Sequence, residues 1–268
     1  MTTNTRWDEQ CRIARGFTLV EMMVAIVIGL VATVSFYKSF VAFAAVAGTQ
    51  EQTVEMAQNL RVGIDHLARE IRMAGFNGSG QENLQPGFLL AEADSLRITR
   101  DLRGGGDDAI DNDHDGLVDE LDEEELADGV LDDNYEDVIY FLAGPNENGS
   151  FDLQQMDING ASDTVVENVD ALNFVYLDKK GKPLAVPADG VDVSTTPPVA
   201  DLDKIRGVEI TLVVRTTNGD HSYRDQRIYR NNRDSNGDGV SDLLMVGPGD
   251  NFHRRVLTTM VKCRNLGL

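Results

Sequence analysis

The sequence is poor in cysteine and in basic residues, and each shortage excludes a feature. Of its two cysteines, Cys11 and Cys263, the first lies in a segment that we expect to be removed, which leaves one thiol and no internal disulfide. The 24 Lys and Arg residues stand against 45 Asp and Glu, so the formal net charge is −21. Binding of nucleic acid needs a basic face for the phosphates. We therefore expect no nucleic acid among the partners, and cations fit this acidic chain better.

The sequence also lacks the spacings that mark common active sites. Its four histidines are His66, His114, His221 and His253, and none belongs to an HExxH pattern that would hold catalytic zinc. There is no CxxC pair, no serine elbow and no glycine-rich phosphate loop. We therefore expect no enzyme activity, with Cys263 a buried apolar residue and His66 a surface or packing residue.

One long apolar run lies near the N-terminus. Residues 1–16 are polar and include three arginines, whereas residues 17–48 carry only Glu21 and Lys38 as charged side chains. A helix of about 20 apolar residues spans the roughly 30 Å hydrocarbon core of a bilayer. Arginines before such a helix keep the N-terminus in the cytoplasm. The run therefore predicts a single-pass protein of the cytoplasmic (inner) membrane whose remaining chain lies outside the cytoplasm.

Two simpler interpretations of this run explain less of it. A secretory signal peptide has an apolar stretch of about 7 to 15 residues, roughly half the length found here. An ordinary membrane anchor leaves Glu21 unexplained, because an unpaired carboxylate inside a bilayer is costly. Cleavage between Gly16 and Phe17 would create an ammonium group on Phe17, one helical turn from Glu21. The two charges could then pair within one chain or between neighbouring chains.

The residues around this bond, Arg15-Gly16-Phe17-Thr18-Leu19-Val20-Glu21, resemble the processing site of type IV prepilins and of type II secretion pseudopilins. The resemblance implies that residues 1–16 are a leader and that a prepilin peptidase cuts after Gly16 and methylates the amine of Phe17. It also implies that Glu21 serves filament assembly. The implied partners are other pilins and minor pilins, bound through the N-terminal helix, and the pilus filament is the final location.

The helix is predicted to continue well beyond the membrane. No proline occurs from Phe17 to Ala74, and hydrophobic residues in the later half recur at spacings of four and three. We therefore expect a membrane or filament-core half, 17–48, and an amphipathic half, 49–76, that packs on the globular domain. The apolar face comprises Leu60, Ile64, Leu67, Ile71 and Ala74, and the helix ends at Gly75, Gly78 and Gly80. The polar face, expected to be solvated, comprises Arg61, Asp65, Arg69, Glu70 and Arg72.

Residues 57–76 resemble the corresponding part of PilW-type minor pilins, notably in the run Leu67-Ala68-Arg69-Glu70-Ile71. The J-type pseudopilin of type II secretion is similar over the same run. The resemblance implies a minor pilin, a structural and assembly subunit of a type IV pilus placed at or near the filament initiation or tip complex. A J-type minor pseudopilin and a pilus-tip adhesin are the alternatives.

The remaining residues, 77–268, are predicted to form one exported, β-rich domain. Short apolar runs of strand length occur at 95–99, 138–142, 171–177, 208–216 and 256–261. The alternation from Val208 to Val214 suits an antiparallel sheet with one face on the helix. The predicted fold class is therefore α+β, a long N-terminal helix packed on an antiparallel sheet, similar to type IV pilins. Residues 179–203 contain four prolines and are predicted to be an exposed loop or insertion.

Residues 111–122 follow the spacing of a calcium-binding loop. Oxygen donors stand at loop positions one, three, five, nine and twelve, with Gly116 at position six for the sharp turn and a backbone carbonyl at position seven. At position twelve an aspartate replaces the usual bidentate glutamate. A solvated acidic loop is the alternative. The predicted ligands are Asp111, Asp113, Asp115, Leu117, Asp119 and Asp122.

Residues 234–242 repeat the first nine positions of such a loop, but position twelve is Met245, which cannot bind calcium. This is a weaker candidate site, and a glycine-rich turn is the alternative. A calcium ion would cancel the repulsion between clustered carboxylates, so we expect calcium to be a structural cofactor that orders these loops outside the cell. The predicted ligands of the second loop are Asp234, Asn236, Asp238, Val240 and Asp242.

Overall fold

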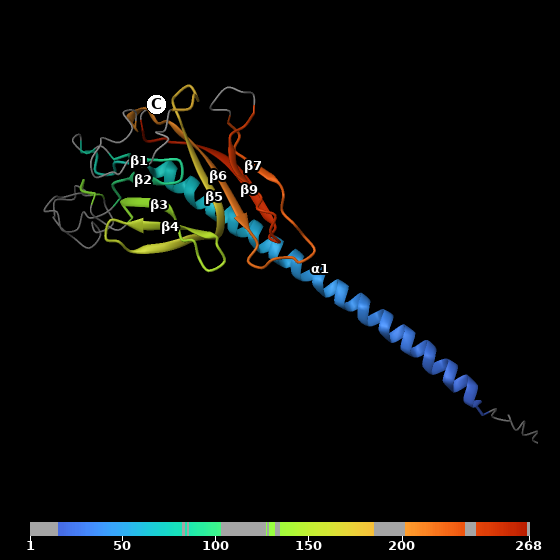
Figure 1. Ribbon diagram of the computed structural model, residues 1–268. Helices are drawn as coiled ribbons and strands as arrows, with labels where there is room; N and C mark the ends of the chain where they lie inside the picture. Colours follow the sequence, from blue (N-terminus) through green and yellow to red (C-terminus); the bar gives the residue numbers. More distant parts are fainter. Residues whose placement is uncertain are drawn as a thin grey trace, which may run out of the picture. The chain divides into compact units, whose positions relative to one another are not determined.

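The structure is a computed structural model that describes residues 16–81, 84, 86–102, 127, 129–131, 135–184, 202–233 and 240–266. Its internal contacts divide the chain into two units, Met1–Gln50 and Glu51–Leu268. The first unit contributes the N-terminal part of one long helix. The second contains the rest of that helix and all the strands (Figure 1).

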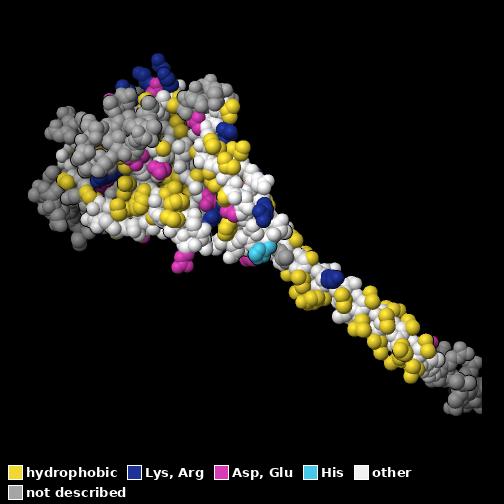
Figure 2. Space-filling view, in the orientation of Figure 1, with side chains coloured by type: hydrophobic (Ala, Val, Ile, Leu, Met, Phe, Trp, Pro, Cys, Tyr) yellow, Lys and Arg dark blue, Asp and Glu magenta, His cyan; other side chains and the backbone are white. Residues whose placement is uncertain are grey.

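Helix α1 (Leu19–Met73) is 55 residues long, which confirms the prediction of one continuous helix. In the first unit its apolar side chains face outward, and Phe36 is 76% exposed and Phe40 71% exposed. By length and composition this is the one helix among the described residues that could cross a membrane, with a mean hydropathy of 2.4 over its most apolar window. Figure 2 shows how densely hydrophobic side chains cover this part of α1.

The second unit is built on a seven-stranded sheet in the order β1-β2-β3-β4-β5-β6-β9, with every neighbouring pair antiparallel. A separate hairpin pairs β7 with β8. The α+β fold and all five predicted strands are confirmed. The strands are β1 (Phe88–Ala91), β2 (Leu96–Thr99), β3 (Asp137–Ala143), β4 (Phe151–Asp157), β5 (Ser162–Leu177), β6 (Gly207–Arg215), β7 (Ile228–Arg230), β8 (Leu243–Val246) and β9 (Arg254–Lys262), with a short 3-10 helix η1 (Leu202–Lys204).

The core lies between the second-unit part of α1 and one face of the sheet. All five residues predicted for the apolar face of the helix are buried in one cluster with side chains from the strands. The helix approaches β5 so closely at Gly63 that an added Cβ would lie 2.0 Å from Cγ2 of Val166. At the other end Gly75 has a φ of +78° and its N–H donates to the carbonyl of Thr99, which ends the helix where glycine was expected to end it.

The polar face of α1 corrects one expectation. Four of its five charged residues are exposed as predicted, but Glu70 is half-buried. Its carboxylate accepts hydrogen bonds from Arg100 at 2.5 Å and from the hydroxyl of Tyr140 at 3.1 Å. Tyr140 is fully buried on β3, and the ring of His66 packs edge-on against it at 5.9 Å. Glu70 and His66 therefore fix the helix to the sheet instead of lying on a solvated surface.

The face of the sheet that points away from α1 is also covered along β6. A sheet that packs on the helix with one face alone would leave this second face exposed to solvent. All nine residues of β6 are buried, including Glu209 and Thr211, which point away from α1. The segment that connects β6 to β9 lies over this face and carries the β7–β8 hairpin. It is tied down by an ion pair of 2.9 Å between Arg233 and Glu209 and by a hydrogen bond of 3.1 Å from Asn231 to Asn173.

Candidate functional site

The predicted processing site lies directly before α1. Gly16 and Phe17 are exposed, with Phe17 84% exposed. The backbone N–H of Thr18 donates to the carboxylate of Glu21 at 2.8 Å, and the N–H of Glu21 donates back to the hydroxyl of Thr18 at 3.2 Å. This reciprocal pair is a capping box, which satisfies N–H groups at the start of a helix. In the uncut chain the nitrogen of Phe17 is an uncharged amide, so Glu21 caps the helix instead of pairing with an amine.

The segment 11–37 matches a family described as the prokaryotic N-terminal methylation motif. The matched span contains Gly16, Phe17 and Glu21 together with the first half of the apolar run. The chain therefore carries an N-terminal methylation motif of the kind found in type IV prepilins. The motif implies processing by a prepilin peptidase, and together with the apolar helix it fits membrane anchoring and a place in a pilus. Pilin-like proteins are structural subunits that assemble with other pilins.

A comparison with solved structures finds a type IV-like pilin from Thermus thermophilus. It is 14% identical, with a TM-score of 0.40, over 79% of this chain and 98% of that chain. At this TM-score the likeness carries no argument about fold or function. A comparison with curated proteins finds no match to this chain.

The first predicted calcium loop, residues 111–122, lies outside the described residues. The described residues that flank it are held by buried carboxylates. Asp101 is fully buried and accepts hydrogen bonds from the N–H of Ser79 at 2.9 Å and the N–H of Gly129 at 3.3 Å. Glu136, also fully buried, accepts one from the N–H of Leu102 at 2.5 Å. The two ends of the acidic segment are therefore tied to the folded domain.

The second predicted loop is carried by the β7–β8 hairpin. Asp234, Asn236 and Asp238 lie outside the described residues, whereas Val240 and Asp242 lie within them. The backbone of Asp242 bonds to Arg233 and Asn231, which closes the hairpin below the loop. The residue at position twelve, Met245, lies in β8. Within the described ranges no three His, Cys, Asp or Glu side chains form a group that could hold a metal, so calcium binding stays a prediction.

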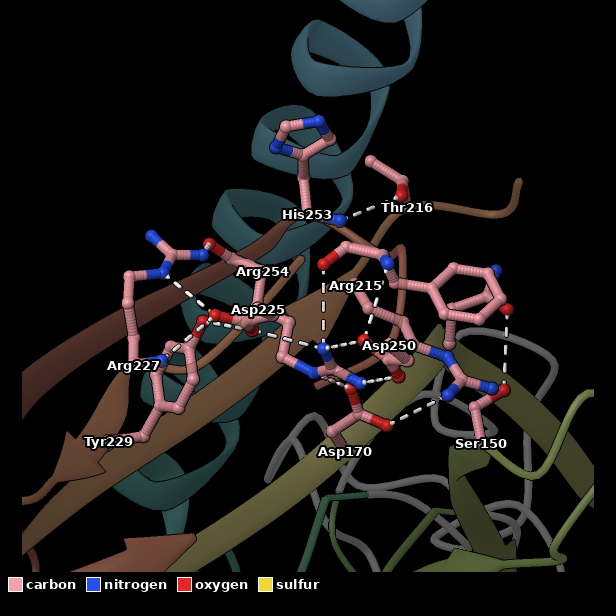
Figure 3. A network of polar contacts seen from close by, with 12 residues as sticks. Ser150, Asp170, Arg215, Thr216, Asp225, Arg227, Tyr229, Asp250, His253 and Arg254 are labelled. Carbon is pink, nitrogen blue, oxygen red and sulfur yellow. Dashed lines mark hydrogen bonds and ion pairs between the residues drawn. The ribbon is translucent and has the colours of Figure 1, made fainter. Parts of the chain in front are cut away.

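A buried ionic cluster on the outer face of the sheet is a feature that sequence reasoning missed. At its centre Arg254, at the start of β9, has a side chain only 1% exposed. Its guanidinium contacts Asp170 on β5 at 2.5 Å, Asp225 at 3.0 Å and Asp250 at 2.6 Å (Figure 3). Arg215 on β6 reaches Asp170 from the other side at 3.5 Å. The cluster thus joins three strands of the sheet to the segment that covers it.

Asp225 is the most enclosed carboxylate of this cluster and is fully buried. Burial raises the pKa of Asp225, but hydrogen bonds from Tyr229, Arg227 and Arg254 outweigh this effect and lower it to about 2. Because the folded-state pKa lies below the ordinary value of about 3.9, ionised Asp225 stabilises the fold above that value. This contribution is lost as the pH falls toward 2.

Cys263 and His253 both pack against other residues of the second unit. Cys263 is buried, and burial raises the pKa of its thiol to about 12, so it is a packing residue as expected. His253 stacks on the ring of Tyr223 with centroids 3.9 Å apart and contacts Asp220 at 3.1 Å. Hydrogen bonds from Ser222 and then from His253 lower the pKa of Asp220 to about 2. These residues form a surface contact of the covering segment.

A cleft of about 300 Å³ lies between the second-unit part of α1 and the end of β6. Its walls carry the amide side chains of Gln52, Gln58, Asn59 and Asn168, together with Arg215. The carboxylates of Glu55 and Glu167 and the hydroxyl of Thr217 also line it.

Proposed function

We propose that this chain is a minor pilin of the PilW type. On this proposal it is made as a prepilin, held in the inner membrane by the apolar half of α1, cut between Gly16 and Phe17 and methylated on Phe17. It then enters a type IV pilus at or near the initiation or tip complex. The second unit lies outside the cytoplasm as the exposed domain of the subunit.

The observation that carries this proposal is the methylation motif at residues 11–37, which includes the start of an exposed apolar helix. The motif accounts for Glu21, which an ordinary anchor leaves unexplained, because cleavage gives this carboxylate a charged partner in a low-dielectric surrounding. The likeness of residues 57–76 to PilW-type minor pilins supports the finer assignment.

Mass spectrometry of the N-terminus tests the processing step. We expect the chain purified from membranes or filaments to begin at Phe17 and to carry one methyl group on its amine. A Gly16→Asp variant should keep its first residues, because a bulky charged side chain replaces the smallest residue at the bond to be cut. Chains that still begin at Met1 in filaments, or that are cut elsewhere, would contradict the proposal.

We also propose that residues 111–122 bind one structural calcium ion. Calcium prefers six to eight oxygen ligands, and the loop supplies carboxylates at the required spacing. Leu102 and Gly129, described residues on either side of the acidic segment, donate hydrogen bonds to the buried carboxylates of Glu136 and Asp101. Ordering the loop would therefore stabilise the second unit as a whole.

Calcium titration of the chelator-treated full chain in detergent tests this site. At a free calcium concentration of about 100 times the Kd, bound calcium should stabilise the fold by about 2.7 kcal/mol. The double variant Asp113→Asn, Asp115→Asn should lose this gain, whereas Asp163→Asn, an exposed aspartate on β5, should keep it. Thermal unfolding with calcium or magnesium gives the readout. If both variants gained the same stability from calcium, residues 111–122 would not be the binding site. Two calcium ions bound per chain would indicate that the second loop, residues 234–242, also binds calcium.

A further inference from the structure

The last strand, β9, forms an open edge of the seven-stranded sheet. It pairs with β6 along its whole length, from Arg254 opposite Arg215 to Lys262 opposite Gly207. No described strand pairs with its other side, because it is the terminal strand of this sheet. The opposite edge of the sheet is the four-residue strand β1, whereas β9 has nine residues. A long open edge presents N–H and C=O groups that another strand can bind.

The register shows which backbone groups face outward. The N–H of Cys263 donates to Arg206 and the N–H of Thr216 donates to His253, which fixes the alternation of hydrogen bonds between β6 and β9. Residues with odd numbers on β9 therefore bond to β6. Residues with even numbers turn their N–H and C=O groups to the open edge. At Arg254 the carbonyl already accepts a hydrogen bond from Arg227. The outward-bonding residues that follow it are Val256, Thr258, Met260 and Lys262.

The side chains along this edge suit a strand partner. Those of the outward-bonding residues lie on the outer face of the sheet, where Val256 is 42% exposed and Met260 is 53% exposed. Apolar and β-branched side chains at alternate positions are those that cross-strand pairs use. The open edge thus combines backbone groups that no described strand pairs with and exposed apolar side chains.

The charge at this edge is opposite to that of the whole protein. Residues 251–268 contain no Asp or Glu, in a chain whose net charge is −21. Of their four Lys and Arg residues, Arg254 is buried and paired with aspartates in the ionic cluster, and the other three are exposed. Arg255 and Lys262 lie at the two ends of β9 and are exposed, and the exposed Arg264 follows. A strand with acidic residues at its ends would therefore meet cations at both ends of β9.

The same charges disfavour a second copy of this chain as the partner. If two β9 edges paired in antiparallel fashion, the end of each that carries Arg255 would lie beside the end of the other that carries Lys262, with the two side chains on opposite faces of the sheet. Like charges brought close together repel each other. A different polypeptide that carries acidic residues avoids this repulsion.

We propose that β9 is a docking edge for an extended acidic segment of another protein, which adds to the sheet as a further antiparallel or parallel strand. Backbone hydrogen bonds from Val256 to Lys262 supply the binding, and Arg255 and Lys262 select acidic flanks. This proposal concerns the second unit alone and does not depend on where the subunit enters a filament.

Peptide binding to the full chain in detergent tests the proposal. The probe is a short fluorescent peptide of alternating Val and Thr with Glu at both ends, and the control peptide has Lys at both ends. Fluorescence anisotropy should give a Kd at least tenfold lower for the Glu-ended peptide. Hydrogen exchange should slow at the amides of Val256, Thr258, Met260 and Lys262 when this peptide binds.

Two sets of variants make the test specific. Met260→Pro removes an outward N–H but no bond to β6, so the fold should persist while binding weakens at least tenfold. Its matched control, Met260→Thr, keeps the N–H and should bind. The double variant Arg255→Glu, Lys262→Glu should bind the Lys-ended peptide more tightly than the Glu-ended one. This reversal tests the proposal even if the proline variant does not fold. Equal binding of both peptides, no saturable binding, or an unreversed preference would overturn the proposal.

Discussion

Replacing Arg254 by leucine is expected to destabilise the second unit by about 3 to 5 kcal/mol, the usual cost of removing one partner from a buried ion pair. The substitution leaves Asp225 and Asp170, which are 0% and 9% exposed in the cluster, without their central cation. A leucine fills much of the space but cannot compensate a buried charge. Urea unfolding of the full chain in detergent, followed by circular dichroism, measures the loss.

A neighbouring arginine provides the control for this prediction. Arg227 also contacts Asp225, at 3.1 Å, but its side chain is 53% exposed. Exposed ion pairs contribute about 0 to 1 kcal/mol, so Arg227→Leu should change the free energy of unfolding by no more than that. If the two variants lost similar free energy of unfolding, the burial of Arg254 would not explain its contribution to stability.

The pH adds a second measurement on the same variant. In the parent chain the pKa of Asp225 is lowered to about 2, so its stabilising charge is present above about pH 4 and is lost toward pH 2. Without Arg254 the carboxylate takes up a proton more readily. The difference in stability between Arg254→Leu and the parent should therefore shrink as the pH falls from 5 toward 2. A constant difference over this range would contradict the electrostatic explanation.

The sequence predicted those parts of the fold in which hydrophobic residues recur at a regular spacing. The spacing of Leu60, Ile64, Leu67 and Ile71 marks the buried side of α1, because helical residues three and four apart share a face. The run Val208 to Val214 marks β6, because alternate residues of a strand share a face. Both patterns are local, so a single sequence is enough to find them.

The ionic cluster could not be found in this way. Its members Asp170, Asp225 and Arg254 are far apart in the sequence and come together only when the segment after β6 folds over the sheet. Without that cover, an arginine in a strand such as β9 is expected to face water. The one available signal was Val213, an apolar residue on the same face of β6 as Glu209 and Thr211, where a solvated face would favour a polar one.

The predicted processing site rests on seven adjacent residues, Arg15 to Glu21, which lie within the matched methylation motif. What the sequence did not supply is the local structure of Glu21 before cleavage. Thr18 and Glu21 form a capping box in the uncut chain, so the carboxylate has a partner before any amine exists. On the proposed function, cleavage then creates a charged amine on Phe17 close to Glu21, whose carboxylate the capping box already holds at the first helical turn.

This double role leads to a prediction with a built-in control. Glu21→Gln keeps a side chain that can form the capping box but removes the charge, whereas Glu21→Ala removes both. If pairing with the amine of Phe17 drives assembly, both variants should enter filaments at least tenfold less than the parent, with normal amounts in the membrane and normal cleavage. Immunoblots of sheared filaments and of membranes, scaled to each other, measure the ratio.

The two variants separate the charge from the cap because they differ in one property. A helix start that has lost half of its capping box frays more readily within its first turn, and this effect is confined to Glu21→Ala, because the bond to the hydroxyl of Thr18 remains. Normal incorporation of Glu21→Gln beside a defect in Glu21→Ala would therefore assign Glu21 to helix capping and contradict the charge pair. A defect shared by both, and absent from Lys38→Gln in the same apolar run, would place the requirement at the carboxylate charge one turn from the new N-terminus.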